Sequence, residues 1–298
     1  MSTYPGLCES LRELSAWSWG RLEKADRLGV AYNEETVTEN LLLELALRHS
    51  GRDLDIRAYT KIEEGKGTKS TGGKPTGADW AFWFSDSSNK GVELRVQAKR
   101  LFRSGAYDSL DGTGKQIKDL KKNCGSAIPL YVFYNSQCTD MLRHMCKNLC
   151  CFPTFLRDTD WGCTYAPLSA IPKQQKPKPS EITHMRPWHT LVCDCPCLPS
   201  RGAPTGHTLN LPERISAAVR SAYENLVNNG KPQEKLFKSL NFDANHVAPE
   251  WVALLTEKDE HTKSVPEIDV SIPTSIDSYL AKHGLLGVAI ISERHEDM

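Results

Sequence analysis

The chain has 298 residues, of which 39% are hydrophobic and 25% are charged, and its formal net charge at pH 7 is zero. Such a chain can form one large domain or two small ones, and its zero net charge excludes an overall electrostatic attraction to a polyanion. The first twenty residues lack a basic segment followed by an apolar one, and no run approaches the roughly 20 apolar residues of a membrane-spanning helix. We therefore expect a cytoplasmic protein with no membrane partner.

Helix and strand patterns alternate at the start of the chain. Apolar residues spaced three to four apart predict helices over 5–28 and 36–49, and Thr36 and Glu39 form a T-x-x-E capping box for the second helix. Alternation of apolar and polar residues predicts a strand over 53–62.

The next predicted elements continue this order. Residues 80–85 and 92–100 are typical of two strands joined by a polar turn, which predicts a β-hairpin. Residues 114–123 predict a basic, amphipathic helix, and the continuous apolar run 127–135 predicts a buried strand.

The second half of the chain has a less regular pattern. It predicts helices over 138–150 and 212–228, a short strand over 189–195 and a final buried strand over 284–292. The Pro- and Lys-rich residues 172–182 favour a linker, which marks either a domain boundary or an excursion from the fold.

The predicted hairpin carries a polar face. Because side chains alternate along a strand, one face of residues 92–100 is apolar and the other presents Glu93, Arg95, Gln97 and Lys99. Gln97 and Lys99 are about 6–7 Å apart along such a strand. Asp79 lies about as far from the turn as Lys99, so a carboxylate, an amide oxygen and an ammonium group are expected to converge.

This set of groups suits hydrolysis of phosphodiesters. Mg²⁺ prefers oxygen ligands, which the Asp79 carboxylate, the Gln97 side chain and the backbone carbonyl of Ala98 supply. A bound metal lowers the pKa of a water molecule, and Lys99 is suited to orient that water or to stabilise developing negative charge. The residues predict a metal-dependent phosphodiesterase.

The pattern resembles the PD-(D/E)XK nuclease superfamily over roughly residues 30–140. The resemblance implies a restriction-endonuclease-like core in which Asp79 is the first acid and Gln97-Ala98-Lys99 is the second half of the motif. This Gln-x-Lys form resembles the Mrr-like branch. Glu39 matches the acid often found on the first helix, which implies a catalytic role for it beside Asp79, Gln97 and Lys99.

The resemblance also implies a reaction and a setting. The implied reaction is hydrolysis of phosphodiester bonds, most simply in DNA, with Mg²⁺ or Mn²⁺ as cofactor. The implied setting is prokaryotic or phage defence, and a homodimer or an activating partner is an option. Two departures stand out: Ala78 replaces the proline of the motif, and Gln97 replaces an acid and removes a negative charge. A non-catalytic nucleic-acid-binding protein on a decayed nuclease fold is the alternative.

A local basic region accompanies the motif. Residues 58–122 contain 13 Lys and Arg but 8 Asp and Glu, a local balance of +5. Phosphate contacts need such cations near the reaction centre, although a solvated surface is the simpler interpretation. The residues expected to contact nucleic acid are Lys74, Arg95, Arg100, Arg103 and Lys115.

Ten cysteines are many for a cytoplasmic chain. In a reducing compartment we expect thiols or metal ligands, not disulfides. Two groups, at 146–151 and 193–197, lack a paired C-x₂-C spacing, so zinc is not expected. A zinc-organised interaction module on 138–197 is retained as an alternative.

Together these patterns predict an α/β protein. Residues 1–160 are expected to form a restriction-endonuclease-like core, a mixed β-sheet flanked by helices, together with the N-terminal helix. Residues 161–298 are expected to form a mixed α/β C-terminal extension, and its packing on the same core is left open.

Overall fold

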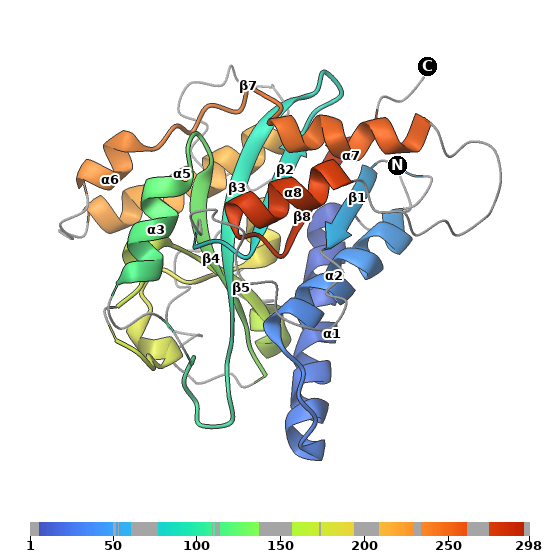
Figure 1. Ribbon diagram of the computed structural model, residues 1–298. Helices are drawn as coiled ribbons and strands as arrows, with labels where there is room; N and C mark the ends of the chain where they lie inside the picture. The colour runs from blue at the N-terminus through green and yellow to red at the C-terminus, as the bar shows by residue number, and fades with distance from the viewer. Residues whose placement is uncertain are drawn as a thin grey trace.

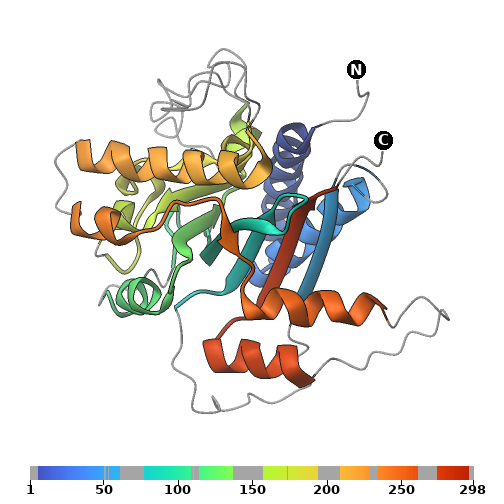
Figure 2. The same ribbon diagram turned by 90° about the horizontal axis from the view of Figure 1, so that it is seen from above.

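In the computed structural model, the described residues form an α/β protein in which helices cover both faces of a mixed sheet (Figures 1 and 2). The described residues are 6–49, 52, 54–60, 77–108, 110, 114–136, 157–172, 174–193, 209–228, 234–260 and 274–294.

The sheet has eight strands in the described part of the chain, in the order β1-β8-β2-β3-β4-β5-β6, and β7 pairs with β3 outside this path. The strands are β1 (Leu54–Thr60), β2 (Trp80–Ser85), β3 (Lys90–Arg100), β4 (Ile128–Tyr134), β5 (Cys163–Pro167), β6 (Arg186–Pro187), β7 (His246–Val247) and β8 (Gly287–Glu293). β2 and β3 are antiparallel, whereas β3 and β4 are parallel.

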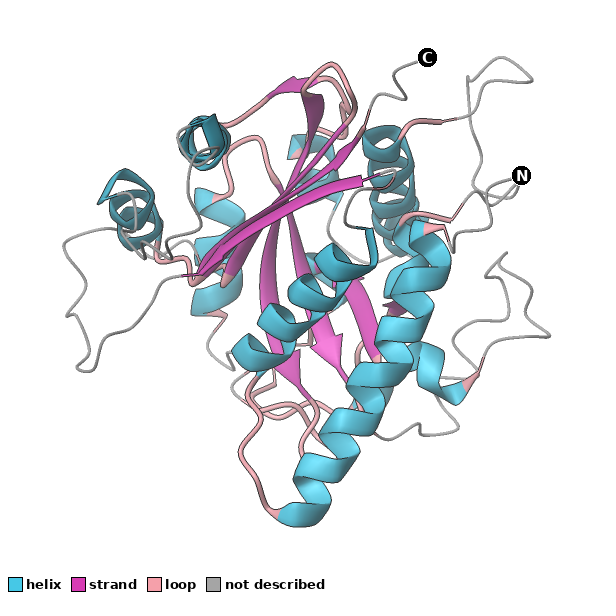
Figure 3. Ribbon diagram, turned by 90° about the vertical axis from the view of Figure 1, so that its right-hand side faces the viewer, coloured by secondary structure: helices cyan, strands magenta, loops and turns pink. Residues whose placement is uncertain are grey.

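Two groups of helices enclose the sheet (Figure 2). One face carries α1 (Leu7–Leu28), α2 (Glu34–His49) and α5 (Leu211–Asn228), and the other carries α3 (Lys115–Asn123), α7 (Glu250–Glu260) and α8 (Thr274–His283). The short helix α6 (Glu234–Ser239) follows α5. Figure 3 shows α1 and α2 lying side by side in front of the sheet.

The predicted hairpin is confirmed. Trp80 pairs with Val96 and Ser85 with Gly91, so β2 and β3 are joined by a tight turn. In that turn the Asp86 carboxylate accepts the backbone N–H of Ser88 at 2.8 Å, and Asn89 has a φ of 59°. Asp and Asn suit this position because their short polar side chains bond the local backbone and tolerate left-handed geometry.

Strand β8, from the second half of the chain, lies inside the sheet formed by the first half. It lies between β1 and β2, antiparallel to the first and parallel to the second. Residues 161–298 therefore supply a central strand of the same sheet, and one hydrophobic core contains residues from both halves, such as Trp83 and Trp251. The sheet is therefore continuous across the boundary expected at residue 160, with strands from both sides of it.

Most of the predicted elements occur within a few residues of their expected bounds. The prediction of a strand over 189–195 is wrong, because Trp188–Leu191 form a 3₁₀ turn directly after β6. Here the Thr190 hydroxyl donates to the Pro187 carbonyl at 2.7 Å, a local bond that competes with strand pairing. The helix predicted over 138–150 lies outside the described residues.

The proposed linker at 172–182 packs on the rest of the fold. The Pro177 carbonyl accepts the backbone N–H of Tyr107 at 2.9 Å, and Ile182 is fully buried. Proline-rich composition therefore marks an irregular but packed segment here, not a separation between domains.

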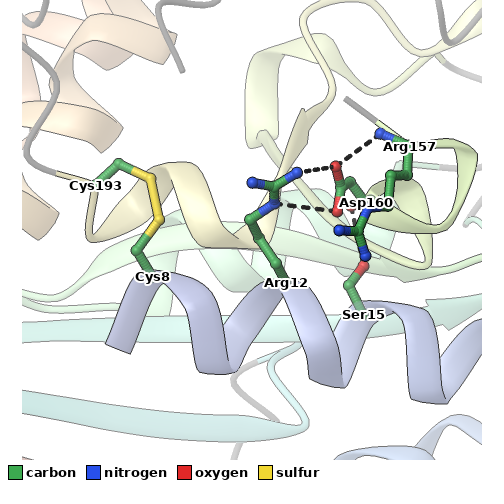
Figure 4. A network of polar contacts seen from close by, with 6 residues as sticks. All are labelled: Cys8, Arg12, Ser15, Arg157, Asp160 and Cys193. Carbon is green, nitrogen blue, oxygen red and sulfur yellow. Dashed lines mark hydrogen bonds and ion pairs between the residues drawn. A yellow bond between two sulfur atoms is a disulfide. The ribbon is translucent and has the colours of Figure 1, made fainter. Parts of the chain in front are cut away.

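A polar network anchors α1 to the far edge of the sheet (Figure 4). The Arg12 guanidinium forms two bonds to the buried carboxylate of Asp160, at 2.8 and 3.2 Å. Ser15 donates to the Asp160 carbonyl at 2.9 Å and accepts the backbone N–H of Cys163 at 2.7 Å. A planar guanidinium paired in this two-bond manner fixes the orientation of the helix as well as its position.

The expectation that the cysteines form thiols or metal ligands and no disulfides is wrong for one pair. Cys8 on α1 and Cys193 form a disulfide, and their Cα atoms are 5.4 Å apart, within the usual range for such bonds. Sequence alone does not reveal this pair, because 185 positions separate its members. Cys124 and Cys163 are buried free thiols.

Candidate functional site

The candidate site lies at one end of the sheet, where β2 and β8 begin and β3 and β4 end. Asp79 comes directly before β2, and its backbone is held on both sides. Its N–H donates to the Val96 carbonyl at 2.8 Å, and its carbonyl accepts the N–H of Leu286 at 2.7 Å. The insertion of β8 therefore helps to fix the backbone from which the Asp79 carboxylate projects.

The two halves of the predicted motif meet here. The Asp79 carboxylate accepts the backbone N–H of Ala98 at 2.9 Å and a short hydrogen bond from the Gln97 side-chain amide. The same amide nitrogen lies 3.3 Å from the Ala98 carbonyl oxygen. The Asp79 carboxylate and the Ala98 carbonyl thus both lie beside the side-chain amide of Gln97, which is the third ligand expected from the sequence.

Helix α3 holds Gln97 from the other side. The Gln116 side-chain amide donates to the Gln97 side-chain oxygen, so both ends of the Gln97 amide are bonded. Gly77 allows this approach: its φ is 75°, and a Cβ there would lie 2.6 Å from the Gln116 carbonyl and 2.9 Å from the Leu120 nitrogen. A glycine is therefore required where α3 crosses the segment that leads to Asp79.

Lys99 lies on the same face of β3, two residues beyond Gln97. Its side chain is buried, and its positive charge lowers the pKa of Asp79. A buried ammonium group is costly unless it faces a negative charge, so this pair is mutually dependent.

Burial dominates the electrostatics of Asp79. Desolvation raises the pKa of its carboxyl from 3.8 to about 7, although the Ala98 N–H, the Lys99 charge and the Gln97 amide each lower it. The charge of Glu34 raises it further. A carboxyl group with such a raised pKa favours an additional positive charge beside it.

The helix acid that acts on Asp79 is Glu34. It is the first residue of α2 and is half-buried, whereas Glu39 is exposed on the same helix. The two are five positions apart, which places them on different sides of a helix. The predicted capping box is wrong, since α2 begins at Glu34, two residues before Thr36, and this earlier start explains why the sequence pattern missed Glu34.

Arg95 was expected to contact nucleic acid, and this expectation is corrected because its side chain is buried. Its side chain pairs with Glu93 at 2.8 Å and donates to the Tyr279 hydroxyl of α8 at 2.8 Å. Glu93 also accepts the indole N–H of Trp251 on α7 at 3.2 Å. Helices α7 and α8 therefore cover the part of the polar face of β3 that carries Glu93 and Arg95. Arg95 is thus part of the protein interior.

The other expected nucleic-acid contacts occupy different positions. Arg100 is buried, where it donates to Asp26 and, at 2.8 Å, to the Tyr32 carbonyl. Arg103 has 56% of its side chain exposed, and Lys115 is an exposed residue at the start of α3. Lys74 lies outside the described residues. Only Arg103 and Lys115 are thus seen where a polymer can reach them.

The donor set fits a hard divalent cation. Carboxylate, amide and carbonyl oxygens are ligands that Mg²⁺ accepts, and Asp79, Gln97 and Ala98 supply one each. In the present arrangement Gln97 turns its nitrogen toward Asp79, so its oxygen reaches the same place after a half-turn of the amide. Within the described ranges, no three His, Cys, Asp or Glu side chains gather as a metal site, and most residues of the two cysteine groups lie outside those ranges.

The fold and this site define a mixed α/β protein with a polar cluster at the end of a central sheet. The chain belongs to a family described as a family of unknown function, DUF6615, whose model matches residues 7–297. No curated protein and no solved structure matches the chain. Across the described residues, no helix is long and apolar enough to cross a membrane.

Proposed function

We propose that this protein is a metal-dependent nuclease that hydrolyses phosphodiester bonds, most simply in DNA, on a restriction-endonuclease-like core. The observation that carries the proposal is the contact between the Asp79 carboxylate and the Gln97 amide, with Ala98 bonded to the same carboxylate. It supports the interpretation of Gly77–Arg100 as one bipartite motif, since a pair of unrelated surface residues has no reason to meet at a buried strand end.

Each residue has a distinct task in this proposal. Asp79, Gln97 and the Ala98 carbonyl hold Mg²⁺ or Mn²⁺, and Glu34 takes the place of Glu39 as the helix acid. The bound ion would supply charge neutralisation and an acidified water. Lys99 orients that water or stabilises the negative charge that develops on the phosphate oxygens. Gln116 fixes the orientation of the Gln97 amide by donating to its side-chain oxygen, and this bond would be exchanged when that oxygen binds the metal.

The decisive experiment measures cleavage of plasmid, linear and single-stranded DNA and of RNA with Mg²⁺ or Mn²⁺, using the wild type, Asp79→Asn and Lys99→Ala. We expect both variants to lose at least about a hundredfold in rate, because charge stabilisation of this kind contributes on that scale. Cleavage that persists in both variants would exclude this site.

A folding control accompanies the activity measurement. Asp79→Asn removes a carboxylate that is costly to ionise at pH 8, but it also removes the negative charge that faces the buried Lys99. Because these two effects oppose each other, we expect the melting temperature of the variant to stay close to that of the metal-free wild type. Loss of activity without loss of stability then assigns Asp79 to the chemistry.

One observation favours a second candidate, a nucleic-acid-binding protein without catalysis. Gln97 is neutral, and both ends of its amide are already bonded, to Asp79 and to Gln116. Binding of DNA that is independent of divalent metal, with no cleavage under any of the conditions above, would favour this candidate.

A further inference from the structure

An open pocket of about 510 Å³ lies between the end of α1 and the loop that leaves β3. Its volume falls in the range of about 300–1,000 Å³ that is usual for pockets that hold small ligands. The pocket is lined by Asp26 in the last turn of α1, by Val30 just after that helix, by Phe102 and Arg103 from the loop, and by Lys176. The loop follows Lys99 and Arg100 directly in the chain, so it leaves the same end of β3 that carries the candidate site.

The loop is held in a fixed shape. The backbone N–H of Phe102 donates to the Ala106 carbonyl at 3.1 Å, and that of Gly105 donates to the Phe102 carbonyl at 2.9 Å. Leu101 forms an antiparallel bridge with Tyr107, whose N–H bonds Pro177. Such bonding presents Phe102 and Arg103 at defined positions, which lowers the entropy lost when a ligand binds.

Phe102 has the character of a stacking platform. It is a large aromatic side chain that remains 39% exposed while lining the pocket. The Arg100 guanidinium carbon lies 5.2 Å from its ring centroid, and Arg100 is itself fixed by Asp26 and by the Tyr32 carbonyl. An aromatic ring supported in this way offers a rigid surface for the flat face of a nucleobase.

Two exposed cations stand at the pocket beside this ring. The Arg103 side chain is 56% exposed and lies 4.0 Å from Asp26, and Lys176 is 64% exposed and 3.5 Å from Asp108. Both are held near the pocket by weak, solvent-screened pairs, which leaves them available for a phosphate. Aromatic and cationic groups in one open pocket are the combination that binds single-stranded nucleic acid.

We propose that this pocket binds one unpaired nucleotide of the nucleic-acid substrate, with its base on Phe102 and its phosphate near Arg103 and Lys176. The inference rests on the proposed nuclease function and names its substrate class. A base inside a blunt duplex cannot reach the pocket, so single strands and frayed ends are preferred over blunt duplex.

The test measures equilibrium binding by fluorescence anisotropy in EDTA, which prevents cleavage. The probes are a short fluorescein-labelled DNA strand, the RNA strand of the same sequence, and the blunt DNA duplex. We expect the wild type to prefer a single strand, Phe102→Ala to weaken that binding about tenfold and duplex binding less than twofold, and Phe102→Trp to retain it.

Matched controls are available for the charged residues. Arg220 on α5 is 58% exposed, lies 3.5 Å from Glu224 and stacks over Phe242, so it resembles Arg103 in setting but lies away from the pocket. Arg103→Ala is expected to weaken single-strand binding and to reduce its salt dependence, whereas Arg220→Ala leaves both unchanged. Unchanged melting temperatures show that the variants are folded.

The outcomes separate this inference from the proposed function. A wild type without preference for single strands, or a Phe102→Ala variant with no loss or an equal loss for both probes, overturns the pocket assignment even if the protein cleaves DNA. If no cleavage occurs with any metal but the binding pattern holds, the nuclease proposal fails and the nucleotide pocket stands.

Discussion

At the scale of single residues, Gln97 sets the charge of the candidate site. Its amide contributes no negative charge, and its nitrogen satisfies the Asp79 carboxylate in the absence of metal. Gln97 thus leaves the Asp79 carboxylate hydrogen-bonded without adding charge, whereas a carboxylate at the same position would add a negative charge beside it.

Gln97→Glu tests this balance. Without metal it places two carboxylates together and removes two hydrogen bonds, so we expect the free energy of unfolding to fall by roughly 1–3 kcal/mol. With Mg²⁺ the added charge raises metal affinity, so the variant should gain more in melting temperature than the wild type. Thermal unfolding over a series of Mg²⁺ concentrations measures both effects. Equal Mg²⁺ responses in the two proteins would contradict a metal site at Asp79.

His189 provides a pH-dependent test away from that site. It is 1% exposed, and neither ring nitrogen has a hydrogen-bond partner within the described part of the chain. Burial lowers its pKa from 6.5 to about 4, opposed by the nearby Asp160 charge and reinforced by that of Arg12. The unfolded chain therefore binds a proton before the folded one does, and stability is lost as pH falls from about 6.5 toward 4.

Replacing His189 with Gln should remove this acid sensitivity. We expect the wild type to lose roughly 2–3 kcal/mol more than His189→Gln between pH 7 and pH 4, as a pKa depressed by that amount implies. Urea unfolding at a series of pH values measures the difference. Parallel pH profiles of the two proteins would show that His189 is not the responsible group.

At the scale of elements, the start of α2 decides which acid belongs to the site. The sequence pattern placed the first turn at Thr36, whereas the helix begins at Glu34, whose charge then acts on Asp79. Capping signals predict helix ends only within a residue or two, because tertiary contacts extend or shorten them. A shift of that size brings Glu34 into the first turn of the helix.

A paired substitution separates the two acids of α2. Glu34→Gln is expected to lower the rate of cleavage at limiting Mg²⁺ by about tenfold or more, as is usual when a charged group beside a metal site is neutralised. Glu39 is exposed, so Glu39→Gln serves as the matched control, and we expect it to change the rate of cleavage by less than twofold. The reverse order of effects would restore Glu39 to the role implied by the nuclease resemblance.

At the scale of the whole molecule, β8 unites the chain. It pairs with β1 on one side and with β2 on the other. A fragment of residues 1–160 lacks β8, so the facing edges of β1 and β2 have no partner. The same residues lose Trp251, which is fully buried and bonds Glu93.

A fragment of residues 1–160 is therefore expected not to fold. We expect it to show no cooperative urea transition in far-ultraviolet circular dichroism, in contrast to the full chain, because unpaired buried backbone groups cost free energy. A cooperative transition in the isolated fragment would show that the first half is an autonomous domain.

The sequence by itself determined the local elements of the first half and the polar residues of the hairpin. Alternation in 92–100 put Gln97 and Lys99 on one face, and the turn after Phe84 predicted the pairing that brings Asp79 near them. These features depend on neighbours close in the chain, so periodicity and turn chemistry are sufficient to read them.

Only the tertiary structure decided the features that join distant residues. The insertion of β8, the approach of Gln116 to Gln97, the burial of Arg95 beneath α8 and the Cys8–Cys193 bond each link residues far apart in the sequence. Long-range packing leaves no periodic signal in the chain. The sequence thus determined that Asp79, Gln97 and Lys99 belong to the candidate site. The fold added Gln116 and the charge of Glu34 to it and decided which cations remain exposed.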